Sequence, residues 1–131
     1  MANSWFRFKQ FTIHQDRCAM KVTTDACLFG AWVTEQILNA DKLTPITEAR
    51  KILDIGTGSG LLALMLAQQT AHSIDALEID QQAFEQAREN IQASSWPDSI
   101  AMIHADARTF QPEFHYDIII SNPPFYEKEL K

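Results

Sequence analysis

One stretch near the middle of the chain constrains its fold more than any other. The residues at 51–55 form an apolar, β-prone run, and those at 61–69 follow a helical pattern. A strand, a tight glycine-rich turn and a helix form the corner at which open α/β sheets hold nucleotide-like ligands. Glycine allows the backbone to bend sharply and lets a ligand approach closely, and the helix start offers free N–H groups. The turn between the two elements carries Gly56, Gly58 and Gly60.

The chain after this corner alternates between strand and helix patterns. Such alternation predicts parallel pairing in βαβ units, and the nearly continuous apolar strand runs suit a sheet covered on both faces. We therefore expect one α/β domain over residues 1–131, with an N-terminal extension at 1–45 and a Rossmann-like core at 46–131. The predicted helices are 59–70 and 81–94, and the predicted spatial order of the strands is 100–104, 73–79, 51–55 and 116–121.

The first 45 residues read differently from the rest. Aromatic and aliphatic residues alternate partly over 5–13, which predicts a strand, and 17–22 could be its partner. Residues 23–25 supply capping chemistry for a helix over 26–39. An N-terminal β-hairpin followed by a helix is therefore expected before the sheet.

Composition excludes several classes of protein. The chain lacks an apolar run of about 18 residues, so no membrane span is predicted, and its aromatic, basic start does not read as a signal peptide. Cys18 and Cys27 have no metal-ligand spacing and read as reduced thiols, so we expect no metal site and a cytoplasmic location. The net charge of −6 argues mildly against nucleic-acid binding, but the charge is uneven. The basic residues near the N-terminus could meet a polyanion or simply be solvated: Arg7, Lys9, Arg17 and Lys21.

Acidic residues follow the next two strands. Glu78 ends the second strand, about 20 residues after the turn, where a carboxylate can accept both hydrogen bonds of a ribose diol. Asp80 could share that role or cap the following helix. Asp106 follows the third strand and could be a ligand contact or a turn residue. This pattern alone would also serve a nicotinamide cofactor.

The spacing of the turn resembles one superfamily more than another. A dinucleotide-binding turn has its third glycine at the sixth position, whereas here Leu61 stands there and Asp54 precedes the first glycine by two residues. This resembles the D-x-G-x-G-x-[GL] turn of class I S-adenosylmethionine (SAM) methyltransferases. The resemblance implies that Gly56, Gly58 and Gly60 pack against the methionine part of SAM. It also implies that Asp54 organises the loop and the ligand's amino group, and that Asp106 meets the adenine amino group.

The end of the fourth strand carries the motif that indicates the reaction. Asn122-Pro123-Pro124-Phe125 resembles the [DNS]-P-P-[YF] motif of methyltransferases that act on adenine N6, cytosine N4 or glutamine amides. An exocyclic amine is a poor nucleophile because its lone pair is delocalised. The Asn122 side-chain oxygen and the Pro123 carbonyl can accept hydrogen bonds from its two N–H groups and so orient it. No strong base is needed, because a sulfonium methyl donor leaves mainly orientation to the protein. Phe125 offers a flat face on which an extruded base could stack.

A closer resemblance covers nearly the whole chain. Residues 6–33, together with 53–56 and 61–68, resemble the bacterial tRNA1(Val) adenine-N6 methyltransferases, which implies SAM as cofactor and tRNA as substrate. In that family the segment around Lys21, Thr24 and Asp25 lies beside the SAM pocket, so these residues are further candidates for cofactor binding. Members of the family continue with three more strands, so we expect this chain to be truncated and its fourth strand to be uncovered.

Three alternatives remain open. A protein-glutamine N5-methyltransferase shares the Asn-Pro-Pro-[YF] motif, although the release-factor enzymes begin with a helical domain. A catalytically silent SAM-binding fragment could pair its open fourth strand with another chain, which leaves the oligomeric state undecided. A nicotinamide-dependent enzyme ranks last because of the glycine spacing.

Overall fold

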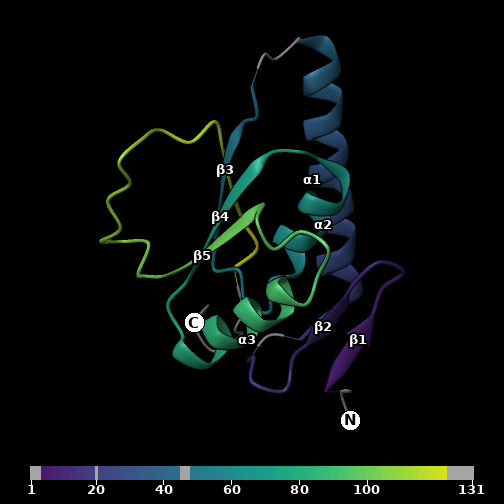
Figure 1. Ribbon diagram of the computed structural model, residues 1–131, viewed down its shortest axis with the longest axis vertical. Helices are drawn as coiled ribbons and strands as arrows, with labels where there is room; N and C mark the ends of the chain where they lie inside the picture. Colours follow the sequence, from purple (N-terminus) through teal and green to yellow (C-terminus); the bar gives the residue numbers. More distant parts are fainter. Residues whose placement is uncertain (1–3, 20, 45–47, 124–131) are drawn as a thin grey trace, which may run out of the picture.

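The computed structural model describes residues 4–19, 21–44 and 48–123. Its centre is a four-stranded parallel sheet, with a separate two-stranded hairpin near one end of the molecule (Figure 1). The observed strand order confirms the predicted one. The first two connections each place a new strand beside the previous one, and the chain then returns across the sheet to pair its last strand with the first. The order is β5 (Ile100–His104), β4 (Ser73–Glu78), β3 (Lys51–Ile55) and β6 (Ile118–Ser121).

Three helices accompany the sheet. They are α1 (Thr24–Leu43), α2 (Leu61–Gln69) and α3 (Gln81–Gln92). The first is longer than the predicted 26–39 and packs along α2. Thr23 caps α1 by accepting a hydrogen bond from the Ala26 amide at 3.1 Å, as the sequence predicted.

The hairpin corrects one prediction. Its strands are β1 (Trp5–Arg7) and β2 (Thr12–His14), so both lie at the stretch 5–13 that was predicted to be one strand. The chain reverses between them, where the Phe8 amide donates to the Phe11 carbonyl at 2.8 Å. The predicted partner strand at 17–22 is wrong, because none of its described residues is in a strand. The amides and side chains of that segment bond instead to α3 and to neighbouring carbonyls.

One hydrophobic core joins the N-terminal part to the sheet. Ile13 of β2, Leu64 of α2 and Ile74 of β4 are fully buried within the same cluster. Val33 and Ile37 bring α1 into it. The hairpin, α1 and the sheet therefore share the apolar burial that stabilises them.

The β6 edge of the sheet stays open within the described part of the chain. β6 pairs with β3 on one side only, and 61% of Ile119 is exposed. β6 begins two residues later than predicted. The Tyr116 hydroxyl, just before the strand, donates a hydrogen bond to Asp75 at 2.6 Å. None of the described helices is long and apolar enough to cross a membrane.

Candidate functional site

The candidate site lies at the edge where the parallel strands end. The register pairs Ile55 with both Leu77 and Ser121, so the segments after β3, β4 and β6 leave the sheet at the same level. The Ser121 hydroxyl donates to the Ile55 carbonyl at 3.0 Å and fixes the last residue of β6. Ligands of open α/β sheets bind at this edge.

The glycine turn has a conformation that other residues rarely adopt. The φ angles of Gly56, Gly58 and Gly60 are +72°, +58° and +90°, in the left-handed region that favours glycine. A Cβ atom at Gly56 or Gly58 would meet nothing within 4 Å. The turn therefore presents bare backbone to open space, which suits close approach of a ligand.

Asp54 supports the turn from inside the protein. Its side chain is only 1% exposed, and it accepts a hydrogen bond from the Thr57 hydroxyl at 2.7 Å. Burial raises the pKa of Asp54 to about 7, and the nearby Glu78 charge adds to the increase. Its contact with the amino group of a ligand stays a prediction.

Glu78 holds the turn from the neighbouring strand, which the sequence did not reveal. Its two carboxylate oxygens accept hydrogen bonds from the Gly58 amide at 2.8 Å and the Asp80 amide at 3.0 Å. The residue is 8% exposed, and each oxygen keeps a further lone pair for another donor. Asp80 caps α3 by accepting from the Ala83 amide at 2.9 Å. Of the two roles considered for Asp80, the structure shows the cap.

Asp106 lies in a turn after β5. Its carboxylate accepts hydrogen bonds from the Arg108 amide and guanidinium, including one at 2.7 Å from Nη2, and its carbonyl accepts from the Thr109 amide. The Arg108 guanidinium lowers the pKa of Asp106 below its usual value, so this carboxylate is ionised. Its contact with an adenine amino group stays a prediction.

The amine-binding motif lies only partly in the described chain. Asn122 and Pro123 are exposed directly after β6, at the level of the glycine turn. Pro124 and Phe125 lie outside the described residues.

The three remaining candidates have different surroundings. The Lys21 ammonium donates to the carbonyls of Gln15 and Cys18, the latter at 2.7 Å, and so folds its own segment. Thr24 and Asp25 are exposed in the first turn of α1. Their contribution to cofactor binding stays a prediction.

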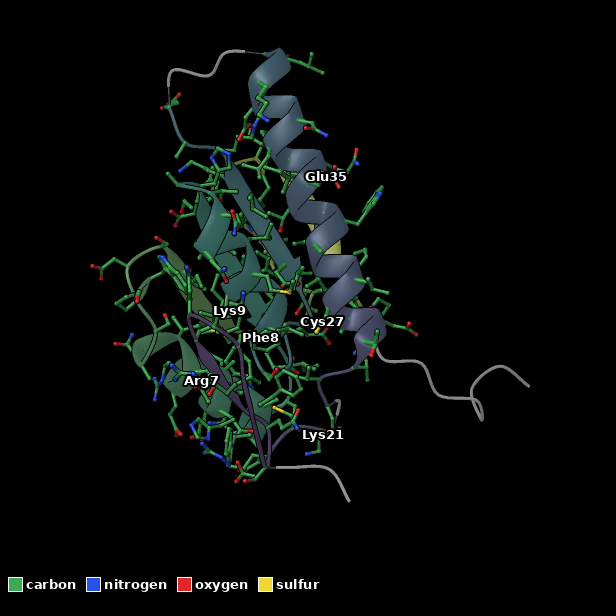
Figure 2. The ribbon with its side chains drawn as sticks, turned by 90° about the vertical axis from the view of Figure 1, so that its right-hand side faces the viewer. Arg7, Phe8, Lys9, Lys21, Cys27 and Glu35 are labelled. Carbon is green, nitrogen blue, oxygen red and sulfur yellow. The ribbon has the colours of Figure 1, made fainter. Side chains whose placement is uncertain are left out.

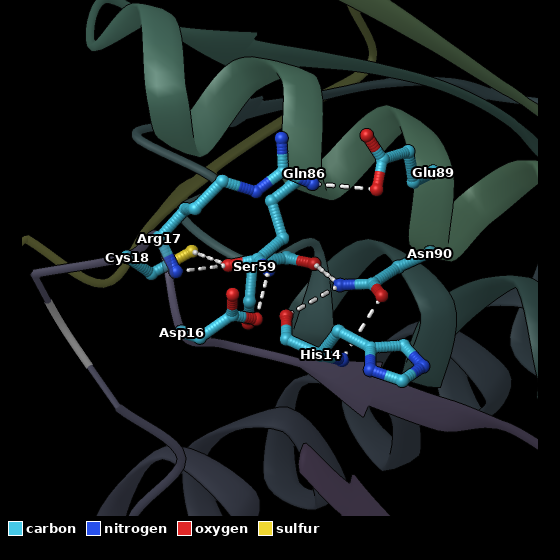
Figure 3. A network of polar contacts seen from close by, with 8 residues as sticks. All are labelled: His14, Asp16, Arg17, Cys18, Ser59, Gln86, Glu89 and Asn90. Carbon is cyan, nitrogen blue, oxygen red and sulfur yellow. Dashed lines mark hydrogen bonds and ion pairs between the residues drawn. The ribbon is translucent and has the colours of Figure 1, made fainter. Parts of the chain in front are cut away.

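A buried network of amide side chains joins the N-terminal segment to the turn (Figure 3). The Asn90 amide nitrogen donates to the carbonyls of His14 at 2.9 Å and Ser59 at 2.8 Å, while its oxygen accepts from the His14 amide. Gln86 accepts from the Arg17 amide at 2.8 Å. Sequence reasoning missed these residues, and the only available signal was their place on the apolar side of α3.

The structure offers no metal centre in its described parts. They contain no group of three or more histidine, cysteine or acidic side chains placed to hold an ion. Cys18 and Cys27 are free thiols, and burial raises the pKa of Cys18 to about 11. A thiol that stays protonated at neutral pH is neither a good ligand nor a nucleophile.

The parallel sheet, the left-handed glycine turn and the acidic residue on the next strand together define a Rossmann-like domain of the methyltransferase type. Solved structures agree with this class. The METTL16 MTase domain aligns with a TM-score of 0.65 at 28% identity, over 85% of this chain and 46% of that chain. A candidate S-adenosyl-L-methionine-dependent methyltransferase from Methanococcus maripaludis aligns with a TM-score of 0.61 at 32% identity, over 73% of this chain and 42% of that chain.

The family follows from the sequence comparison. The model of the family described as "Methyltransferase small domain" matches residues 34–131, and the chain belongs to this family. The predicted methyltransferase fold is thereby confirmed.

Curated relatives share one name. A protein of Tolumonas auensis is 54% identical over 96% of this chain, and one of Dyadobacter fermentans is 50% identical over 98% of it. Both are named tRNA1(Val) (adenine(37)-N6)-methyltransferase. The alignments cover 49% of each relative, so the chain spans about half the length of the curated relatives it matches.

Proposed function

We propose that this chain forms the cofactor-binding and amine-orienting part of a SAM-dependent methyltransferase that modifies adenine N6 in tRNA. One observation carries the proposal. Asn122 and Pro123 leave β6 beside the end of β3, which is the strand that runs into the glycine turn. A methyl donor on the turn and an amine on Asn122 would therefore be neighbours. The names of relatives that are about half identical to the chain support the same reaction.

The residues around the turn fit SAM. The open space beside Gly56 and Gly58 leaves room for the methionine part, and the α2 N-terminus, which has no side-chain cap, offers free N–H groups to its carboxylate. Glu78 keeps lone pairs for a ribose diol. SAM, when bound, supplies a sulfonium-activated methyl group. The residues assigned to this site are Asp54, Gly56, Gly58, Gly60, Glu78 and Asp106, with Lys21, Thr24 and Asp25 as further contributors.

The chain's own part in the reaction is to hold and orient the amine. The Asn122 side-chain oxygen and the Pro123 carbonyl accept hydrogen bonds from the two N–H groups of the amine, which shifts electron density onto its nitrogen. Because the methyl donor is already activated, orientation contributes most of the rate and no strong base is needed. Phe125 would stack the extruded base.

The setting of the protein follows from its substrate. An enzyme that modifies tRNA works where tRNA is made and used, so we place it in the cytoplasm, with tRNA as its macromolecular partner. Residues 1–131 act as one domain in this proposal, which the shared hydrophobic core supports. The uncovered β6 leaves room for pairing with further chain or with another copy.

The test uses protein expressed from its complete gene. It is incubated with SAM and with tRNA that lacks the modification, and N6-methyladenosine is quantified by mass after digestion to nucleosides. We expect a SAM-dependent increase that Asn122→Ala abolishes while SAM affinity stays within about twofold, because this residue meets the amine and not the cofactor. Asn39→Ala, an exposed asparagine on α1, serves as the matched control.

Two results would contradict the proposal. Loss of SAM binding in Asn122→Ala would show that the residue does not lie where we place it. No increase in methylated adenine from protein that binds SAM would favour a protein glutamine amide as substrate. Mass spectrometry of N5-methylglutamine in protein substrates would then decide.

A further inference from the structure

Positive charge in this acidic chain is concentrated in the N-terminal segment. Residues 4–21 hold four cations against the single anion Asp16, while the whole chain carries a net charge of −6. Two of the cations are used internally. Arg17 pairs with Glu89, and the Lys21 ammonium is bound to two carbonyls. The cations left for an external partner are on the hairpin.

The outer face of the hairpin carries an exposed tryptophan beside these cations. The register pairs Trp5 with His14 and Arg7 with Thr12, so the four side chains share the face opposite the buried Ile13. Trp5 is 51% exposed. Arg7 is exposed at the end of β1, and the exposed Lys9 lies in the turn after it, where it also lines a cavity with Glu35 of α1. Figure 2 labels Arg7, Phe8 and Lys9 in this order along the hairpin. Neither cation forms an ion pair within the part of the chain that the structure describes.

This face is held rigidly. On the inner side, the rings of Phe8 and Phe11 stack at 4.8 Å, and Phe11 meets Trp96 edge to face at 6.1 Å. Asn90 ties the His14 backbone to Ser59 of the glycine turn. The outer face is therefore preorganised, and it is anchored beside the reaction edge of the sheet.

An exposed indole beside cations that form no ion pair can bind single-stranded nucleotides through both their bases and their phosphates. Cations neutralise phosphates, and an indole stacks with any base. We propose that the outer face of the β1–β2 hairpin, which carries Trp5, Arg7 and His14, binds unpaired nucleotides of the RNA substrate, with Lys9 at the hairpin turn as a further phosphate contact. This inference rests on the proposed function, since it takes RNA to be the substrate.

The test measures RNA binding separately from methyl transfer. Protein from the complete gene is titrated into a fluorescein-labelled anticodon stem–loop RNA over a KCl series, and anisotropy gives the affinity and its salt dependence. We expect Arg7→Gln/Lys9→Gln to lower the slope of log K against log salt by about 1.5, because each lost phosphate contact removes about 0.7–0.9. Lys51→Gln serves as the control, because it removes an exposed cation at the start of β3, the end of that strand away from the glycine turn. It should leave the slope unchanged.

Trp5 gives a second, independent readout. We expect Trp5→Ala to weaken RNA binding by about 5- to 150-fold through the loss of base stacking, with the salt slope unchanged. Trp5→Phe should restore most of the affinity, which excludes a folding defect. Labelled inorganic polyphosphate, which has no bases, should bind Trp5→Ala as tightly as the unaltered protein.

The outcomes separate this inference from the proposed function. If the hairpin variants keep the RNA affinity and salt slope of the unaltered protein and still methylate tRNA, the proposed RNA-binding role of the hairpin is wrong and the proposed function stands. Equal weakening of polyphosphate and RNA binding by Trp5→Ala would overturn the stacking role. Protein that neither binds nor methylates RNA would overturn both, and an acidic polypeptide would then be the next partner to examine.

Discussion

Glu78→Gln tests whether this carboxylate holds the glycine turn even without a ligand. In the structure both of its oxygens accept backbone amides, those of Gly58 and Asp80. Glutamine keeps one acceptor and turns the other into a donor that faces an N–H group. The variant therefore loses one charge-assisted hydrogen bond, and the one that remains becomes neutral.

The magnitude follows from these two bonds. A hydrogen bond to a charged group contributes about 1.5–3 kcal/mol, which is the cost of the bond that is lost. The remaining bond is weakened because its acceptor is no longer charged, but this is partly offset because glutamine does not repel Asp54. We expect the free energy of unfolding to fall by about 2–3 kcal/mol. Glu85→Gln makes the same chemical change at a half-buried position on α3, where the side chain accepts a hydrogen bond from Gln81 one turn earlier, and should stay within about 0.5 kcal/mol.

The assay is urea unfolding of both variants in the absence of SAM, followed by calorimetric titration with SAM. The midpoint should fall in Glu78→Gln while the slope m stays constant, which identifies a change in stability. If Glu78 also binds the ribose, SAM affinity should fall by roughly 10- to 150-fold, the equivalent of 1.5–3 kcal/mol. Equal midpoints for the two variants would refute the role in the turn, and unchanged SAM affinity would remove Glu78 from the ribose.

Two further predictions concern buried polar groups. The folded-state pKa of Asp54 is raised to about 7, so the folded protein binds a proton that the unfolded chain releases above about pH 4. Stability should therefore fall as the pH rises from about 4 to 7, by up to about 1.4 kcal/mol per pH unit, and Asp54→Asn should remove this dependence in urea unfolding measured across that range. Asn90→Asp keeps the acceptor for the His14 amide but loses both donated bonds and buries a charge, so we expect at least about 2 kcal/mol of lost stability in the same assay. Wild-type stability in that variant would contradict the network.

The sheet could be predicted from sequence because its information is local. Each strand from 51 onward is a short apolar run, each helix pattern follows within a few residues, and the handedness of βαβ crossovers leaves few arrangements. The glycine turn was equally visible, since its left-handed φ angles require a residue without a side chain. The strand pattern and the glycine turn together place the candidate site at the end of β3.

The N-terminal part was less predictable for physical reasons. Its hairpin turns between Phe8 and Phe11 through Lys9 and Gln10, without the glycine, proline or asparagine that normally indicates a turn. The aromatic alternation therefore read as one long strand. The amides on α3 that fix this part bond to residues about seventy positions earlier, and sequence patterns carry no trace of such pairs.

The two halves of the proposed site depend on different parts of the sheet. The glycine turn and Glu78 belong to β3 and β4, which are paired on both sides and packed into the core. Asn122 follows β6, a four-residue strand that pairs with β3 alone within the described chain. Methyl transfer requires the amine to be held to a fraction of an ångström, whereas cofactor binding tolerates more freedom at β6. A change at the exposed Ile119 edge should therefore affect turnover much more than affinity for SAM.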